Sequence, residues 1–168
     1  MQLTFERAQP EDAAAIAAIR IAASEQLTLT HGEGPWSWMV SMDSVVRSLH
    51  TPYVLVARVG RTPVATLRLQ SRKPWAIAPL DFSPVTKALY LVDMAVDPEL
   101  QRRGVGRECL VEAARLARAW PARAIRLDAY DAPAGAGSFY QRCGYREVGR
   151  ARSRGTALRY YEFLIEDR

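Results

Sequence analysis

The chain has 168 residues, the size of one ordinary domain, and can bury a core without disulfides or a structural metal. Apolar residues make up 49% and charged residues 24%, as in most globular proteins. No apolar run is long enough to span a membrane, and acidic residues near the start do not fit a signal peptide. Cys109 and Cys143 lie in no CxxC motif or histidine cluster, so we expect no metal site. We therefore expect a single cytoplasmic domain over residues 1–168.

The positive charge of the chain comes almost entirely from arginine. The net charge is +5, and Lys73 and Lys87 are the only lysines. Arginine binds planar, multi-oxygen anions such as phosphate better than lysine does. The composition therefore favours a phosphate-bearing partner, either a nucleotide cofactor or a nucleic acid. The arginines are scattered and no nucleic-acid-binding motif is present, so nucleic acid ranks last.

The first half of the chain predicts two helices and a hairpin. One helix begins at Pro10-Glu11-Asp12, where acidic residues suit the positive end of the dipole, and a second covers part of residues 37–49. Residues 53–59 and 64–70 read as two strands around a tight turn. Residues 71–87 have three prolines and no sustained period, which predicts a long loop; such loops are often functional.

The second half alternates between strands and helices. Residues 88–96 form a nearly continuous apolar run, typical of a strand buried on both faces. A helix is predicted over residues 104–119, a strand over 124–130 and a short helix over 133–142. The last stretch reads as two strands around Arg152–Gly155. This order of elements predicts a mixed α/β fold with a central sheet.

The sharpest feature is the segment Gln101-Arg102-Arg103-Gly104-Val105-Gly106, between a predicted strand and a predicted helix. Gly104 and Gly106 lack side chains, so backbone N–H groups can approach an anion closely. The helix adds unpaired N–H donors and the positive end of its dipole, and Arg107 adds a guanidinium. We expect a cradle for a pyrophosphate. The segment fits neither a Walker A loop, since no Gly-Lys pair exists, nor the GxGxxG fingerprint.

Two motifs resemble the signatures of one enzyme family. The run from Val96 to Gly106 resembles the [QR]-x-x-G-x-[GA] signature of the GNAT acyltransferases, and the run from Phe139 to Tyr145 resembles their second signature, FYxxxGY. Both stand in the family's order at a typical separation, and the resemblance covers nearly the whole chain. It implies an α/β fold with a mixed, mostly antiparallel central sheet and a splayed cofactor strand, flanked by about four helices.

The resemblance also implies an acetyl-CoA-dependent N-acetyltransferase that acts on a primary amine of a small molecule or peptide. In this family the signature loop holds the CoA pyrophosphate through backbone amides, and the preceding strand binds the pantetheine arm. By this resemblance the cofactor-binding residues are Met94, Ala95, Val96, Gln101, Arg102, Arg103, Gly104, Val105, Gly106 and Arg107. GNAT proteins are frequently dimers, so a homodimer is expected by analogy, and the sequence leaves the oligomeric state open.

Two residues are candidates for catalysis. Tyr140 falls on the family's tyrosine beside the CoA sulfur, where a phenol with a pKa of ~10 can protonate the leaving thiolate. The alternative is that Tyr140 is one more core aromatic beside Phe139. Asp93 interrupts the apolar run of its strand, where a carboxylate needs a partner or a function. It either takes the proton of the amine, directly or through water, or anchors a neighbouring backbone group or arginine.

Strand alternation places Asp93 on the side of Leu91 and Ala95, unless a bulge shifts the phase by one residue.

One position departs from the family pattern, because Pro133 stands where an asparagine often touches the pantetheine or sulfur region. This departure supports a second hypothesis, a GNAT-like module that binds or senses acyl-CoA without catalysis. The amine acceptor and the preferred acyl-chain length stay open, and we expect acceptor specificity to reside in residues 27–39 and 71–87.

Overall fold

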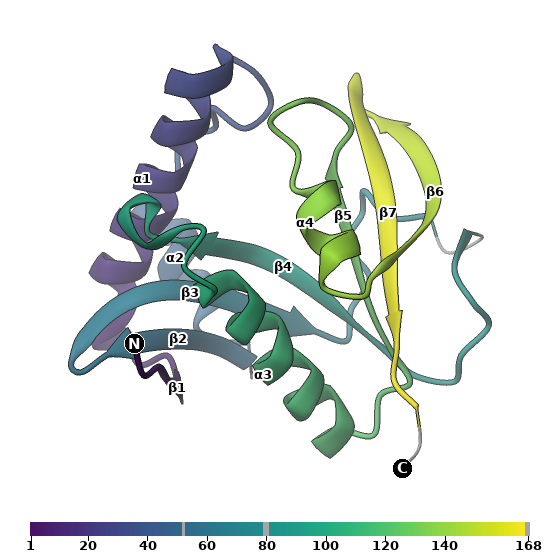
Figure 1. The fold of residues 1–168 in the computed structure, drawn as a ribbon, viewed down its shortest axis with the longest axis horizontal. Coiled ribbons are helices and arrows are strands. Elements are labelled where there is room, and N and C mark those ends of the chain that lie inside the picture. The colour runs from purple at the N-terminus through teal and green to yellow at the C-terminus, as the bar shows by residue number, and fades with distance from the viewer. Residues whose placement is uncertain (52, 79–80, 167–168) are drawn as a thin grey trace. The chain divides into compact units, whose positions relative to one another are not determined.

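The computed structural model describes residues 1–51, 53–78 and 81–166. The described strands form one seven-stranded sheet in the order β1-β2-β3-β4-β5-β7-β6 (Figure 1). The pairing of β4 with β5 is parallel, whereas those of β1 with β2, β2 with β3, β5 with β7 and β6 with β7 are antiparallel. The strands are β1 (Thr4–Arg7), β2 (Tyr53–Val59), β3 (Thr62–Gln70), β4 (Ala88–Val96), β5 (Ala124–Tyr130), β6 (Arg146–Ser153) and β7 (Thr156–Leu164).

Four described α-helices accompany the sheet, together with two short 3-10 turns. The helices and turns are η1 (Pro10–Asp12), α1 (Ala13–His31), α2 (Met42–Ser48), η3 (Pro98–Leu100), α3 (Val105–Ala119) and α4 (Gly137–Arg142). The predicted fold class is confirmed: a mixed, mostly antiparallel sheet with four helices. None of the described helices is both long and apolar enough to cross a membrane.

Contacts within the chain divide it into two compact units. The first comprises Met1–Gln70 with Val92–Glu112, and the second comprises Ser71–Leu91 with Ala113–Arg168. Two elements contribute residues to both units, because β4 and α3 each contain one of the boundaries.

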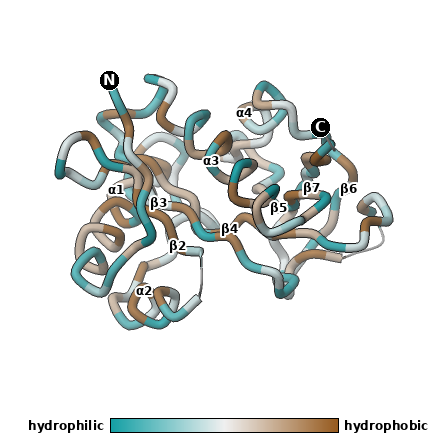
Figure 2. Tube along the Cα trace, turned by 90° about the horizontal axis from the view of Figure 1, so that it is seen from below, coloured by the Kyte–Doolittle hydropathy of each residue, from teal (hydrophilic) through white to brown (hydrophobic). Residues whose placement is uncertain are grey.

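The core of the first unit lies between its two N-terminal helices and β2. Ile16 of α1 and Val45 of α2 are buried against Val54 and Val56 of β2. Residues two apart on a strand point to the same face, so both helices cover one face of this strand. Figure 2 shows β2 as a predominantly hydrophobic segment. The apolar faces of these two helices and of β2 thus build this core.

The second unit has its own core, which includes part of the predicted 71–87 loop. Ile77 and Phe82 of that loop are buried together with Tyr90, Leu158 and Tyr160. The ring of Phe82 stacks on that of Tyr160 at 5.6 Å between centroids. The described part of the loop, residues 71–78 and 81–87, has no strand or α-helix, and residues 79–80 lie outside the described residues.

A buried ion pair fixes this loop further. The Glu162 side chain on β7 is fully buried, and its Oε1 accepts a hydrogen bond from Arg126 Nε on β5 at 3.1 Å. Arg126 also donates to the carbonyl oxygen of Ser83 at 2.6 Å, and Ser83 N–H donates to Glu162 Oε2 at 3.2 Å. The guanidinium also lies over the Phe82 ring at 4.8 Å. The loop is thus tied to two strands of its own unit by charge-assisted hydrogen bonds.

Candidate functional site

The predicted pyrophosphate cradle is an exposed turn that leads directly into α3. Residues 101–104 are exposed, and Val105 begins the helix and is buried. Arg102 (φ 59°) and Gly104 (φ 89°) both have left-handed backbone conformations. A Cβ added at Gly104 would meet no heavy atom within 4 Å, so the space beside this backbone is open. The first N–H groups of a helix have no acceptor within the helix, so this turn can bind an anion.

The expected cofactor strand changes character halfway along its length. Leu89, Tyr90 and Leu91 are buried, whereas residues 92–96 are only half-buried. Burial on both faces was therefore the wrong expectation for the second half of β4, because nothing covers that half completely. The described ladder with β5 ends at the pair Tyr90↔Arg126, although β4 continues to Val96. A strand that extends beyond its ladder keeps backbone groups with which a ligand can pair.

Asp93 lies at the point where β4 becomes irregular. Its φ of 53° is in the left-handed region, which breaks the regular alternation of the strand. Its Oδ1 accepts from Arg20 Nη2 at 2.9 Å and its Oδ2 pairs with Arg68 Nη2 at 2.8 Å. The carboxylate thus joins α1, β3 and β4 within the first unit. Neither arginine was among the residues selected from the sequence.

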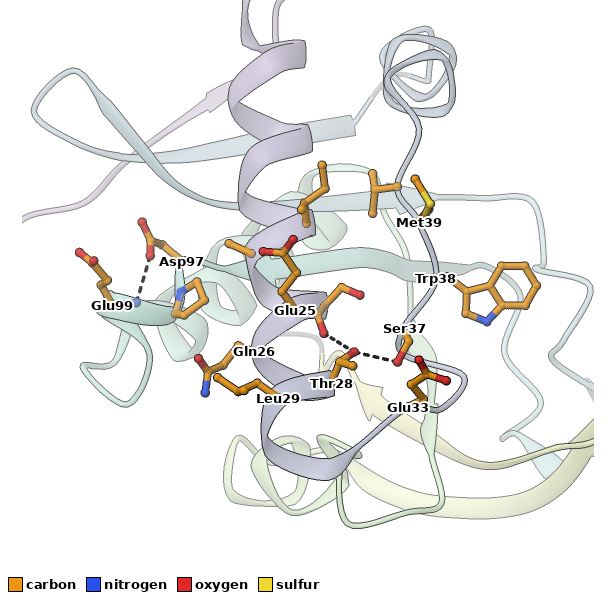
Figure 3. Close-up of a pocket in the computed structure, with 15 residues that line it drawn as sticks. Glu25, Gln26, Thr28, Leu29, Glu33, Ser37, Trp38, Met39, Asp97 and Glu99 are labelled. Carbon is orange, nitrogen blue, oxygen red and sulfur yellow. Dashed lines mark hydrogen bonds between the residues drawn. The ribbon is translucent and has the colours of Figure 1, made fainter.

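A cavity of about 1040 Å³ lies beside α1 in the same unit (Figure 3). Its carboxylates come from α1, from the segment after it, and from η3 with the residue before it, and among the described residues its lining includes no lysine or arginine. In its lining, the Thr28 and Ser37 hydroxyls share a hydrogen bond of 2.7 Å that joins α1 to the segment after it, and Trp38 has 76% of its surface exposed. Four carboxylates line this cavity: Glu25, Glu33, Asp97 and Glu99.

Tyr140 belongs to the second unit and lies within a cluster of aromatic rings. Its ring centroid is 5.3 Å from that of Phe139, 5.7 Å from Tyr145 and 5.9 Å from Tyr161. Burial raises the pKa of Tyr140, and the nearby charge of Asp128 raises it further. The phenol is therefore held in its protonated form at neutral pH, the form that a proton donor needs.

The helix that carries Tyr140 begins later than predicted. The structure starts α4 at Gly137 rather than at Pro133, because residues 131–134 form bends and turns and residues 135–136 are irregular. A Cβ at Gly137 would clash with the hydroxyl of Tyr161, so only glycine lets this helix approach β7 so closely. Pro133 is exposed in the preceding turn.

Sequence reasoning did not select Asp128 of β5, which is half-buried. Burial raises the pKa of this carboxyl, and its charge contributes to the raised pKa values of Tyr130 and Tyr140. The available signal was a carboxylate in a strand whose other residues, apart from Arg126, are apolar or aromatic. Among the residues that the structure describes, no group of three or more His, Cys, Asp or Glu side chains could hold a metal ion.

Comparisons with known proteins identify the family and the fold. The acetyltransferase (GNAT) family matches residues 18–145. No curated protein matches the chain. A GNAT-family acetyltransferase from Streptococcus agalactiae 2603 has the same fold, with a TM-score of 0.80 and 14% identity, over 98% of this chain and 96% of that one.

Two similar structures were solved with the cofactor or its product. YncA, a putative acetyltransferase from Salmonella typhimurium in complex with acetyl-CoA, has a TM-score of 0.72 and 16% identity, over 99% of this chain and 95% of that one. PaiA N-acetyltransferase from Thermoplasma acidophilum in complex with coenzyme A has a TM-score of 0.73 and 15% identity, over 97% of this chain and 100% of that one. Since the family match covers most of the chain and the fold agrees, this protein belongs to the GNAT acetyltransferase family.

Proposed function

We propose that this protein transfers an acetyl group from acetyl-CoA to the primary amine of a small molecule or peptide, by direct attack in a ternary complex. The loop from Gln101 to Arg107 carries the proposal. It is exposed up to Gly104, it has two residues in left-handed conformations, and it opens the N-terminus of α3. Arg102, Arg103 and Arg107 surround it with positive charge suited to a pyrophosphate. Membership in the GNAT acetyltransferase family supports the same donor.

The reaction needs few groups from the protein. The amine nitrogen attacks the thioester carbon, an N–C bond forms, and the C–S bond breaks to release the CoA thiolate. Backbone N–H groups near Met94 polarise the carbonyl oxygen. Water takes the proton that the amine loses, and Tyr140 gives its proton to the thiolate and regains one from solvent. The role of Tyr140 rests on its position in the FYxxxGY motif and on its protonated state.

Of the two roles open to Asp93, we assign the anchoring one. Both carboxylate oxygens are already paired with guanidinium groups, one with Arg20 and one with Arg68. Taking a proton from the amine would weaken both ion pairs at the moment of reaction. Asp93 therefore positions two arginines beside β4, and the amine proton leaves through water.

Thermal unfolding with acetyl-CoA tests the cofactor, with ATP and NAD as control ligands. A ligand at ~100 times its Kd stabilises the folded state by ~2.7 kcal/mol, or roughly 5–10 °C for a chain of this size. We expect this shift with acetyl-CoA and not with ATP or NAD. Absence of a shift at millimolar acetyl-CoA would contradict the proposal.

A pair of glycine variants locates the site. Gly104→Ala and Gly60→Ala both place a Cβ at a positive φ, and in both the added atom meets nothing within 4 Å. Both should lose ~1–2 kcal/mol of stability from backbone strain. We expect only Gly104→Ala to lose the stabilisation by acetyl-CoA, because its Cβ stands where the pyrophosphate approaches. Equal stabilisation of both variants by acetyl-CoA would place the cofactor elsewhere.

The alternative, an acyl-CoA-binding module without catalysis, is favoured by Pro133 at the position where the family often has asparagine. Such a module predicts the thermal shift with acetyl-CoA but no release of CoA with any amine. A thiol-release assay across a panel of primary amines separates the two functions. We expect amine-dependent release of CoA.

A further inference from the structure

A small cavity in the first unit collects arginines from three elements. It has a volume of about 320 Å³ and is lined by Arg20 of α1, Arg47 of α2 and Arg68 of β3. The other lining residues are Ser44, Ser48 and Asp93. Three guanidinium groups therefore face a single carboxylate, and the cavity keeps an excess of positive charge.

The hydrogen bonds around this cavity show which groups are available to a ligand. Ser44 Oγ donates to the carbonyl oxygen of Ser41 at 2.8 Å, and Ser48 Oγ donates to that of Val45 at 2.6 Å. Both serine protons are therefore already used. A ligand that needs donors must take them from the arginines.

The arginines are incompletely satisfied. Arg20 and Arg68 share the one carboxylate of Asp93. Within the described part of the chain, Arg68 Nε is buried without an acceptor, and Arg47 is exposed with no ion pair or side-chain hydrogen bond. Guanidinium groups bind carboxylates in a planar, paired geometry. An anion in this cavity would gain from all three arginines.

We propose that the acceptor amine carries a carboxylate, which these three arginines hold while the amine attacks the thioester. The inference rests on the proposed function and adds the class of acceptor to it. Asp93, which orients two of the arginines, lies on β4 and directly precedes Met94, the first of the expected cofactor-binding residues. The carboxylate is thus bound close to the strand that presents the acetyl group. A cavity near the lower end of the ~300–1,000 Å³ range fits a compound of amino-acid size.

Matched acceptor pairs test the assignment. Each pair consists of an amino acid, including γ-aminobutyrate, and its carboxamide, which keeps the shape and loses the charge. We expect kcat/KM to be about 10- to 100-fold higher for the acid, through a lower KM, as for a charge-assisted contact. Arg47→Gln should remove most of this preference, because it raises KM far more for the acid than for the carboxamide. Arg61→Gln, an exposed arginine in the β2–β3 turn, is the matched control and should keep the preference.

The cofactor's own phosphates are the other source of an anion, and the Kd for acetyl-CoA distinguishes them. An unchanged Kd for acetyl-CoA in Arg47→Gln supports the acceptor site, whereas a Kd raised tenfold overturns the proposal.

Calorimetric titration of the CoA-bound protein with the same acids and carboxamides gives a readout that needs no turnover. Equal binding of acids and carboxamides, or no binding of any acid at 10 mM, also overturns the proposal that the acceptor carries a carboxylate. Failure of the proposed function is a different result: no acetyl-CoA binding, or acid binding without acetyl transfer.

Discussion

The aromatic rings around Tyr140 determine its proton chemistry. We predict that Tyr140→Phe lowers kcat by ~10²–10⁴-fold, the usual contribution of a general acid, and leaves the Kd for acetyl-CoA nearly unchanged. The phenylalanine keeps the ring contacts with Phe139, Tyr145 and Tyr161 and removes only the hydroxyl group. Steady-state kinetics and calorimetry measure the two quantities, with Tyr53→Phe as the control. An unchanged kcat would exclude the acid role.

The same residue predicts the form of the pH profile. Burial raises the pKa of Tyr140 above its ordinary value of ~10, so the phenol stays protonated throughout the neutral and mildly alkaline range. The rate should rise with pH as the attacking amine loses its proton, and it should not fall again below about pH 10. A loss of rate near pH 8 that disappears in Tyr140→Phe would show an acidic phenol, contrary to this expectation.

The loop at residues 101–107 shows that local residue types can predict a local turn from the sequence. Its glycines, arginines and place before a helix are local features, and they predicted a turn that the structure contains. The partners of Asp93 were not predictable in this way. Arg20 and Arg68 are distant from it in the sequence, and only the packing of α1 and β3 brings them to it. Long-range ion pairs leave no periodic signal.

At the scale of elements, the buried ion pair between Arg126 and Glu162 makes the 71–87 loop part of the core. We predict that Glu162→Gln lowers the free energy of unfolding by about 3–5 kcal/mol, because it leaves a buried guanidinium without its charge partner. Chemical denaturation measures this change. The control is Glu6→Gln, which breaks the exposed pair with Arg58 and should cost no more than ~1 kcal/mol. Similar costs for the two variants would mean that the loop is not held by this pair.

Elements with strong periodicity were the best predicted. The β2–β3 hairpin, the long helices and the final strand pair lie where hydrophobic spacing, turn residues and helix ends placed them. The start of α4 was misplaced, since it depends on the fit of Gly137 against Tyr161 rather than on a local signal. The burial of β4 was also only half predicted. An apolar run in a sequence shows that a strand can be buried. Whether another element packs over that strand depends on the tertiary structure.

At the scale of the whole molecule, β4 and α3 each belong to both compact units, so each unit depends on elements that it shares. Cys109 lies on α3 and is fully buried, and burial raises the pKa of its thiol to about 12. At pH 8 only ~1 in 10⁴ of these thiols would be ionised. We predict that a thiol reagent does not modify Cys109 in the native protein and modifies it fully in denaturant, as peptide mass spectrometry can show. Rapid native modification would mean that α3 opens locally.

The left-handed backbone of Asp93 is a local strain that the two ion pairs of the same residue offset. A glycine at this position would relax the φ of 53°, a conformation that costs a residue with a side chain of order 1 kcal/mol. The same replacement would release Arg20 and Arg68, which both depend on the aspartate for their orientation. Laboratory evolution for thermal tolerance alone would therefore gain nothing from Asp93→Gly, because the two released guanidinium groups would lose their counter-charge and repel each other. Evolution under demand for one acceptor would retain the strained aspartate as well.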